Sequence, residues 1–493
     1  MISMNTPIFD FVSEYLASGT SRLHMPGHKG VSFLGCEPRD LTEITGADDL
    51  FHADGIIDES EANAASLFGT YRTFYSTEGS SHVIRAMLML ASGCFPRHQS
   101  ERRFTVLAAR NVHKAFISAC ALLDLDVDWL YPDDTTAELS LKTESASDAA
   151  GFRTMPASIC SCLITSEQLH SELGSRSAAG CLPDAVYITS PDYLGNLADV
   201  RGLSNVCKTF GLPLLVDNAH GAYLHFLQTP AHPMDLGAAM CCDSAHKTLP
   251  VITGGAYLHI APDMPGFGPE MPARLASCAK QALSVFGTSS PSYLILQSLD
   301  LCNRYLADGY KKRLDETIQS VDHLKDTLRD LSVPFLETEP LKLVLGCAPL
   351  GLSGSDVSDI LRKHMVECEF TDSEYVVLMF TPENRDKDYN RILAACRDIM
   401  HVSQRGKDHD TAISKEPVSL PVLERACPIR EALLGPSRII PAQEAEGEIC
   451  AIPTVSCPPA IPIAVSGERF NAQAVRLLKR YGIDEVSVIA DRN

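Results

Sequence analysis

The sequence predicts an α/β protein with an open, mostly parallel sheet, and three observations support this fold class. Short apolar runs such as "AVYITSP" (residues 185–191) and "LPLLVDNAH" (212–220) end in polar residues, which is typical of strands buried on both faces of a parallel sheet. Stretches with helical spacing lie between these runs, for example residues 200–211. The 493 residues are 45% hydrophobic, enough for a large core and about three domains.

The first third of the chain predicts helices followed by strands. Residues 6–19 carry apolar side chains at helical spacing and end in Gly19, so we expect an N-terminal helix there. A second helix is expected over 61–74. A glycine–serine turn at 79–81 then precedes a third helix over 82–93. The runs "RFTVLAA" (103–109) and "DVDWLY" (126–131) predict strands.

The second half predicts two smaller units. One long helix is expected over 292–331, followed by strands at 341–347 and 375–382. A charged, polar stretch at 403–417 predicts a linker, and the proline-rich remainder predicts a small terminal domain with turns and edge strands. We therefore expect a large domain with the N-terminal segment over 1–300, a small α/β domain over 301–402 and a C-terminal α+β domain over 418–493.

The charge and composition of the chain argue against several classes of binding partner and site. The net charge of −20 disfavours nucleic acid and anionic membranes as partners. The N-terminus lacks the pattern of a secretory signal, and the apolar runs are shorter than the ~18 residues of a bilayer span. A cytoplasmic protein is expected. The seventeen cysteines include no CxxC pair, so we expect no metal site and read them as small buried side chains kept reduced.

One aspartate and one lysine stand out as candidates for chemistry. Asp217 ends the apolar run 212–217, and Lys247 lies in "DSAHKTLPVITGGA" (243–256). Ligands bind beyond the carboxyl ends of strands in open α/β sheets. A lysine withdrawn from water loses proton affinity, as Schiff-base chemistry requires. An aspartate facing a pyridine nitrogen would keep that ring protonated. The alternative is that Asp217 caps a turn and Lys247 is a solvated surface residue.

Three neighbouring features favour the chemical interpretation. The "TGG" segment at 253–255 allows close backbone approach. The stretch "EGSSH" (78–82) opens a helix with glycine and hydroxyl groups, which suits a phosphate. His113 directly follows a predicted strand, where an imidazole could stack on a flat ring.

These motifs resemble those of the fold-type-I pyridoxal-phosphate decarboxylases of ornithine, lysine and arginine, in the shorter form that lacks an N-terminal wing domain. The resemblance implies an aspartate-aminotransferase-like large domain, pyridoxal 5′-phosphate as cofactor, a small cationic amino acid as substrate and polyamine-pathway amines as products. It also implies a homodimer with shared active sites. The matching stretches run in family order through nearly the whole chain: "RLHMPGHKG" (22–30), "LTEITGADDLFHADGIIDESE" (41–61), "EGSSHVIRAML" (78–88), "RNVHKA" (110–115), "TSPDYLGNLADV" (189–200), "DNAHGAY" (217–223), "DSAHKTLPVITGGA" (243–256), "TSSPSYLIL" (288–296) and "PPAIPIAVSGE" (458–468).

By this resemblance, the catalytic residues are Lys247, His220 and His113. Lys247 would bind the cofactor covalently and transfer protons, Asp217 would pair with the pyridinium nitrogen, and His113 would stack over the ring. His220 would lie near the ring hydroxyl or the reacting carbon. The phosphate would be held by Gly79, Ser80, Ser81, Ser244 and His246. Ser289 or Ser290 would lie near the phosphate in a neighbouring subunit. The "HMPGHK" stretch (24–29) would line the site or simply form a glycine–proline turn.

The chain departs from the family pattern at the place expected to select the substrate. Ile452 stands where relatives often have glutamate, Cys457 replaces the usual tyrosine, and Asp192 replaces a threonine. Asp192 could supply an alternative acid or simply form a turn after Pro191. A Ser/Ala-rich excursion near 135–150 also departs from the family. The substrate therefore stays open among lysine, arginine and ornithine.

Two other functions are compatible with parts of the pattern. An aminotransferase or β-eliminating lyase would use the same scaffold and cofactor. A non-catalytic regulatory paralogue would keep the fold, but the retained lysine, aspartate and histidine argue against it. A serine hydrolase lacks its G-x-S-x-G elbow here.

Overall fold

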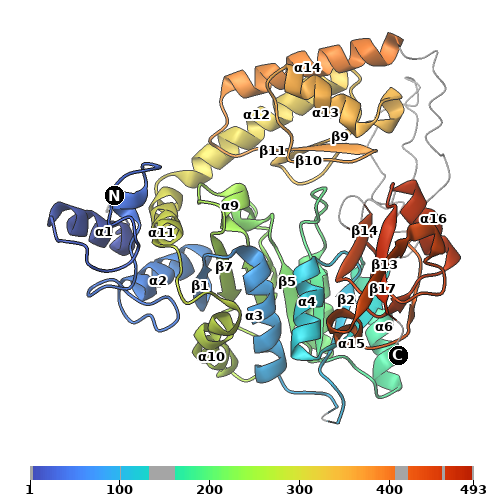
Figure 1. Ribbon diagram of the computed structural model, residues 1–493, viewed down its shortest axis with the longest axis horizontal. Helices are drawn as coiled ribbons and strands as arrows, with labels where there is room; N and C mark the ends of the chain where they lie inside the picture. Colours follow the sequence, from blue (N-terminus) through green and yellow to red (C-terminus); the bar gives the residue numbers. More distant parts are fainter. Residues whose placement is uncertain (1–3, 100, 133–161, 406–419, 458–460, 491–493) are drawn as a thin grey trace.

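A computed structural model describes residues 4–99, 101–132, 162–405, 420–457 and 461–490 (Figure 1). Its centre is a seven-stranded sheet in the order β1-β7-β6-β5-β4-β2-β3. Strand β7 runs antiparallel to its neighbours β1 and β6, and the pairs from β6 to β3 are parallel. The predicted fold class is confirmed. The strands are β1 (Arg72–Ser76), β2 (Thr105–Ala109), β3 (Asp126–Leu130), β4 (Ala185–Thr189), β5 (Leu214–Asp217), β6 (Met240–Asp243) and β7 (Ala256–Ile260).

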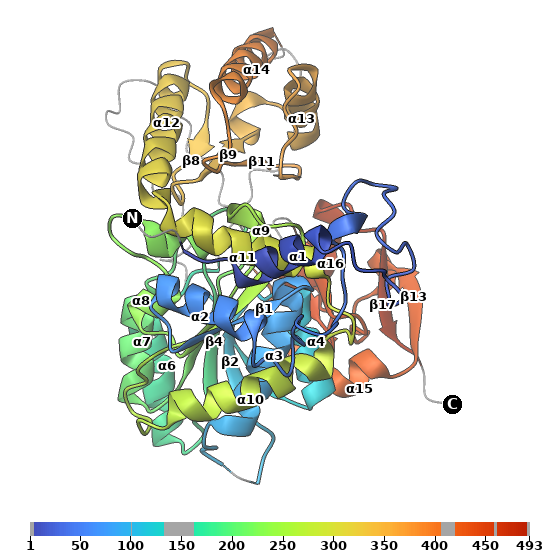
Figure 2. The ribbon, with the colours of Figure 1, turned by 90° about the vertical axis from the view of Figure 1, so that its left-hand side faces the viewer.

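Helices cover both faces of this sheet (Figures 1 and 2). On one face α3 packs between α4 and α10, and on the other α6 packs against α7. The N-terminal helix lies against α11, away from the sheet. The helices of this region are α1 (Pro7–Ala17), α2 (Ile56–Phe68), α3 (Gly79–Cys94), α4 (Lys114–Leu123), α6 (Ser166–Ala178), α7 (Val200–Thr209), α8 (Pro233–Leu236), α9 (Ala245–Thr248), α10 (Met271–Phe286) and α11 (Tyr293–Ala307).

The predicted bounds of two helices were wrong, and in each case a glycine ends or interrupts the helix. The helix expected over 61–74 is α2, which ends at Phe68 because Gly69 turns into the left-handed region at φ 63°; the next residues pair with β7 as strand β1. The helix expected over 292–331 is two helices. Gly309 at φ 69° separates α11 from α12 (Tyr310–Asp330).

A small domain stands above the sheet (Figure 1). Its antiparallel sheet has the order β10-β11-β9-β8 and carries α12, α13 and α14 on one side. The two strands predicted at 341–347 and 375–382 are β9 and β11. The remaining bounds are β8 (Phe335–Leu336), β9 (Lys342–Gly346), α13 (Gly354–Lys363), β10 (Phe370–Thr371), β11 (Tyr375–Met379) and α14 (Asp386–Arg405).

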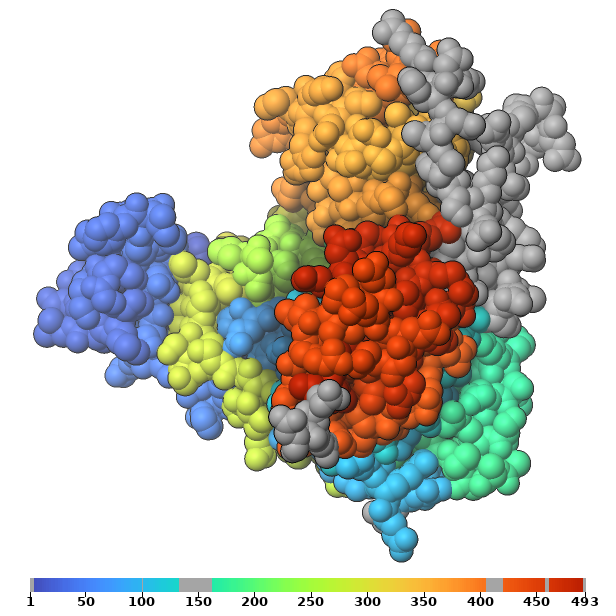
Figure 3. All heavy atoms as spheres, turned by 45° about the vertical axis from the view of Figure 1, so that its right-hand side comes forward, coloured from blue at the N-terminus to red at the C-terminus, as the bar shows by residue number. Residues whose placement is uncertain are grey.

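The terminal segment packs beside the large sheet as a compact unit with its own core (Figure 3). It contains three two-stranded sheets, as the proline-rich sequence suggested. The division of the chain at residues 300, 402 and 418 stays a prediction, and the excursion near 135–150 lies outside the described residues. The elements are β12 (Glu424–Arg425), α15 (Ile429–Leu434), β13 (Ser437–Pro441), β14 (Thr454–Cys457), β15 (Ile461–Val465), β16 (Glu468–Arg469), α16 (Ala472–Arg480) and β17 (Glu485–Ile489).

A buried ion pair joins the terminal unit to the large domain. Arg110, directly after β2, forms two 2.7 Å hydrogen bonds with the carboxylate of Glu468. Its guanidinium also donates to the carbonyl oxygens of Pro462 and Ile463, both at 3.2 Å. The side chains of Arg110 and Glu468 are almost wholly excluded from solvent. Removing either charge would therefore leave the other buried and unpaired, at a large cost in stability.

We expect Arg110→Ala to destabilise the protein by about 3–5 kcal/mol, because it leaves the Glu468 charge buried and unpaired. The measurement is the melting temperature, with Arg329→Ala as control. Arg329 forms exposed ion pairs with Asp326 and Glu337, which contribute about 1 kcal/mol or less. Equal melting temperatures for the two variants would contradict this view of the Arg110 contact.

Within the described ranges, none of the helices combines the length and apolar character needed to cross a bilayer.

Candidate active site

Asp217 and Lys247 follow two neighbouring parallel strands. Asp217 is the last residue of β5 and pairs with Cys242 of β6. Lys247 lies in α9, the single turn that begins two residues after β6 ends. The carboxyl ends of adjacent parallel strands meet at one sheet edge, where open α/β sheets bind ligands. The Lys247 Nζ lies 2.9 Å from Nε2 of His220, three residues past Asp217.

The surroundings of Lys247 lower its proton affinity. Burial lowers the pKa of its ammonium from the usual value, the nearby Lys342 cation lowers the pKa further, and the Asp217 carboxylate acts in the opposite direction. The net shift is downward, so more of the neutral amine is present at a given pH. A neutral amine is the form that attacks a carbonyl carbon.

His220 is a buried, neutral imidazole. Burial and the cations of Lys342 and Lys247 hold its pKa well below the ordinary value. Its Nε2 lies 2.9 Å from the Lys247 Nζ. Among the described residues its Nδ1 has no hydrogen-bond partner. An unpaired buried nitrogen of this kind is costly unless a bound group pairs with it.

The Asp217 carboxylate is buried, and its hydrogen bonds to the described residues are 3.2 Å or longer. One oxygen accepts from the Ala219 amide at 3.2 Å and from the Cys242 thiol at 3.5 Å. The other accepts from the Tyr187 hydroxyl at 3.4 Å. Buried charges normally have strong partners, so this carboxylate has room for a cationic donor such as a protonated ring nitrogen.

Hydroxyl groups gather at the start of α3. The Ser244 hydroxyl donates to that of Ser80 at 2.8 Å, joining the residue after β6 to the first turn of this 16-residue helix. Gly79 begins the helix at φ 73°, and a Cβ there would lie 3.9 Å from the His246 ring. Ser81 follows on the same turn. Helix N-termini with free amides and hydroxyls bind phosphate.

His113 lies on the loop after β2. It caps α4, with Nδ1 accepting from the Ala115 amide at 3.2 Å, and its side chain is exposed. Strand β4 separates β2 from β5 in the sheet, so His113 approaches the edge from a different strand than Asp217. Ser289 and Ser290 are exposed on the turn between α10 and α11; their role across an interface stays a prediction.

The structure decides between the two interpretations of Asp192. Its buried carboxylate accepts from the Asn196 amide at 2.9 Å and from the Asn196 side chain at 2.8 Å. It therefore forms the turn after Pro191 and is not free to bind substrate. Ile452 is partly buried against the terminal core, and the side chain of Cys457 lies outside the described residues.

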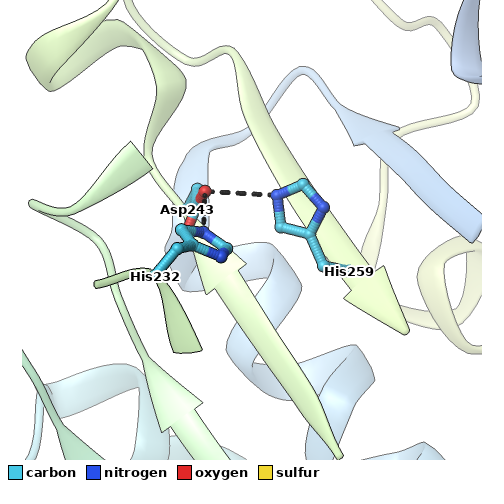
Figure 4. Close-up of side chains that lie close together, drawn as sticks. All are labelled: His232, Asp243 and His259. Atoms are coloured by element: carbon cyan, nitrogen blue, oxygen red, sulfur yellow. Dashed lines mark hydrogen bonds and ion pairs between the residues drawn. The ribbon is translucent and has the colours of Figure 1, made fainter. Parts of the chain in front are cut away.

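Two buried groups near the site were not predicted. Lys342, the first residue of β9, lies 3.1 Å from the Glu339 carboxylate and donates to the carbonyl oxygens of Asp192 and Tyr193, both at 3.3 Å. Asp243 is flanked by His232 and His259 (Figure 4). The sequence signal for Asp243 is that an acidic residue ends the otherwise apolar run "MCCD" (240–243).

Comparison with known proteins identifies the family. Residues 6–342 match the model of the Orn/Lys/Arg decarboxylase major domain. The chain belongs to the Orn/Lys/Arg decarboxylase family. An arginine decarboxylase of Bacillus cereus is 26% identical over 97% of this chain and 100% of its own length. An arginine decarboxylase of Bacillus subtilis is 27% identical over 95% of this chain and 92% of its own.

Solved structures agree on the fold. The lysine decarboxylase LdcF of Francisella novicida superimposes with a TM-score of 0.75 at 16% identity, over 98% of this chain and 81% of that one. The constitutive lysine decarboxylase of E. coli gives a TM-score of 0.72 at 16% identity, over 99% and 82%. The predicted fold-type-I architecture and the family resemblance are both confirmed.

This Orn/Lys/Arg decarboxylase uses pyridoxal phosphate, and the residues at the sheet edge fit that cofactor. The Nδ1 of His220, which has no hydrogen-bond partner within the described part of the chain, is open to a polar contact with the ring. The Asp217 carboxylate can pair with a protonated nitrogen, and the Ser80–Ser244 pair lies at a helix N-terminus. Lys247, the one of these with an amine, would hold the aldehyde carbon.

Proposed function

We propose that this decarboxylase removes the α-carboxylate of lysine, arginine or ornithine, releasing CO2 and the corresponding amine, with the cofactor bound at Lys247. The contact between Lys247 and His220 beside Asp217 carries the proposal. In this contact, Lys247, whose proton affinity is lowered, lies beside the neutral imidazole of His220. Both residues are at the edge of the sheet where open α/β folds bind ligands.

Pyridoxal phosphate, when bound, accepts the electron pair left at Cα as CO2 departs. The chain's own groups make that possible in distinct ways. Asp217 would keep the ring nitrogen protonated, because a carboxylate beside it favours the cation. The hydroxyls of Ser80 and Ser244 and the first turn of α3 would hold the phosphate. His113 would stack over the ring and help to orient it.

Lys247 and His220 handle the proton. With the cofactor bound, Lys247 would hold its aldehyde carbon. The Lys247 Nζ lies 2.9 Å from His220 Nε2. Once freed by the substrate amine, the ammonium form of Lys247 would donate a proton to Cα and become the neutral amine, which solvent would reprotonate.

Incubation of the pure protein and pyridoxal phosphate with each of the three amino acids tests the proposal. We expect one of them to yield CO2 and a diamine or agmatine, identified by mass, without any keto acid. An aminotransferase would require the keto acid. Consumption of none of the three amino acids would contradict the proposal.

Glu369 is our candidate for the acid that binds the distal cation of the substrate. Its exposed carboxylate accepts from the Tyr193 hydroxyl at 3.3 Å, and the Tyr193 ring packs edge-on against His220 with centroids 5.2 Å apart. A bond from its backbone amide to Val377 O at 2.9 Å fixes its place beside β11. A series of contacts thus leads from Lys247 through His220 and Tyr193 to the Glu369 carboxylate.

Glu369→Gln should raise the KM for the basic substrate about ten- to hundredfold, because a hydrogen bond to a charged group contributes about 1.5–3 kcal/mol. The kcat should change little. Glu367→Gln is the matched control, since Glu367 is exposed two residues earlier and pairs with Arg362 at 3.1 Å. Equal KM values for the two variants would remove Glu369 from substrate binding.

We further propose a cytoplasmic homodimer that acts in polyamine synthesis. The segment carrying "HMPGHK" leaves large apolar side chains in solvent: Leu23, Phe33 and Leu34 are 93%, 77% and 89% exposed in the single chain. Exposed apolar clusters of this kind are typical of subunit interfaces. Light scattering of the purified protein should give twice the mass of the chain or a multiple of it.

A further inference from the structure

Asp243 is the acceptor for three side-chain donors in the core of the large domain. One carboxylate oxygen accepts from Nε2 of His232 at 2.9 Å and from Nε2 of His259 at 3.1 Å. The other accepts from the side-chain amide of Asn218 at 2.6 Å. The Asp243, His232 and His259 side chains are fully excluded from solvent, and both imidazoles point at the same oxygen (Figure 4).

The donors come from separate elements around the cofactor edge. Asn218 directly follows Asp217 on the loop after β5. His232 caps α8, and His259 lies on β7, where its Nδ1 bonds the Thr73 hydroxyl of β1 at 2.8 Å. One carboxylate therefore ties together β1, β7, β6, α8 and the loop that carries Asp217.

Both sequence neighbours of Asp243 touch the proposed cofactor site. The thiol of Cys242 lies 3.5 Å from the Asp217 carboxylate. The Ser244 hydroxyl donates to Ser80 at the phosphate end. Lys247 follows within the next turn. A shift of Asp243 would therefore move groups at both ends of the cofactor.

The ring protons make this a hydrogen-bonded cluster and not a metal site. Nδ1 of His232 accepts from the Met234 amide at 3.3 Å, so the proton of the neutral ring is on Nε2, facing Asp243. A metal ion would need the lone pair of that nitrogen. Burial alone would raise the pKa of Asp243, but the two imidazoles hold it below its usual range. The cluster thus contains a carboxylate anion.

We infer that Asp243 is a positioning residue. Through its bond to Asn218 it holds the loop that carries Asp217 against β6, the strand that precedes Lys247. His232 and His259 in turn hold the Asp243 side chain in place. The inference rests on the proposed function for the roles of Asp217 and Lys247. Asp243 itself would contact neither the cofactor nor the substrate. Its loss would leave three buried donors without an acceptor, which is unfavourable in the protein interior.

The test compares Asp243→Asn with Asp300→Asn in the full-length protein. Asp300 of α11 is a matched control because it is a fully buried carboxylate that accepts from Ser60 at 2.6 Å and from the Phe9 amide at 2.9 Å. Among the described residues, these partners are not the cofactor residues named above. Loss of a buried acceptor should lower the melting temperature of both variants. Only Asp243→Asn should raise the Kd for pyridoxal phosphate at least tenfold and lower kcat at least tenfold with KM within about twofold.

Asn218→Ala is a second test if Asp243→Asn does not fold. It removes the hydrogen bond between Asn218 and Asp243 and leaves the Asp243–histidine contacts in place. We expect the same rise in the Kd for pyridoxal phosphate. Wild-type Kd and kcat in Asn218→Ala, or equal changes in Asp243→Asn and Asp300→Asn, would overturn the inference. The Kd for pyridoxal phosphate is measured without substrate. It therefore tests this inference even if the wild-type protein releases CO2 from none of the basic amino acids. That result would refute the proposed function but not the role of Asp243.

Discussion

Lys247→Ala should release CO2 from the basic amino acid at less than about a thousandth of the wild-type rate. The substitution removes the amine whose Nζ lies 2.9 Å from Nε2 of His220 at the edge of β5 and β6. Without this amine, the cofactor would not be bound covalently, and the ammonium that we propose as the proton donor to Cα would be missing. The measurement is CO2 release at saturating pyridoxal phosphate, so that weaker cofactor binding does not account for the loss.

Lys312→Ala controls for the removal of a lysine as such. The Lys312 side chain is 82% exposed and forms only a long ion pair with Glu316 at 3.7 Å. We expect wild-type turnover and wild-type melting temperature for this variant. Substantial turnover in Lys247→Ala, at a rate near that of Lys312→Ala, would show that another group carries the chemistry.

Asp217→Ala should lower kcat by several orders of magnitude while the protein remains folded. In the proposed function this carboxylate would keep the ring nitrogen protonated, and only the protonated ring accepts the electrons from Cα efficiently. Asp217→Asn separates charge from shape: it keeps the size of the side chain but loses the anion. We expect it to resemble Asp217→Ala in kcat, measured at saturating substrate and cofactor.

Asp192→Asn is the matched control for Asp217. Asp192 is also a buried acid, and it follows the neighbouring strand β4, but both its oxygens bind Asn196 within a turn. Its replacement should leave kcat within about twofold of wild type. If Asp192→Asn lost activity and Asp217→Asn kept it, the roles assigned to these two aspartates would be reversed.

The large sheet was predictable because its strands carry their own signal. Runs such as 185–189 and 214–217 are continuously apolar and end in polar residues, so their burial and direction follow from the sequence. Helix ends were less predictable. Gly69 and Gly309 adopt positive φ and end or interrupt helical patterns that the apolar spacing alone would continue.

The site was predictable where residues are close in sequence to a strand end. Lys247, Asp217 and His220 could be placed at one edge because β5 and β6 are neighbours. The cluster around Asp243 could not, because His232 and His259 meet it through the packing of α8 and β7. The same limit applies to Lys342, which reaches the site from the small domain.

Reduction with borohydride followed by peptide mapping tests the central claim most directly. The protein is incubated with pyridoxal phosphate, reduced, digested and analysed by mass spectrometry. We predict that the pyridoxyl group is found on Lys247 and is lost from that peptide in Lys247→Ala. A pyridoxyl group on a different lysine, or on none, would contradict the assignment of this site.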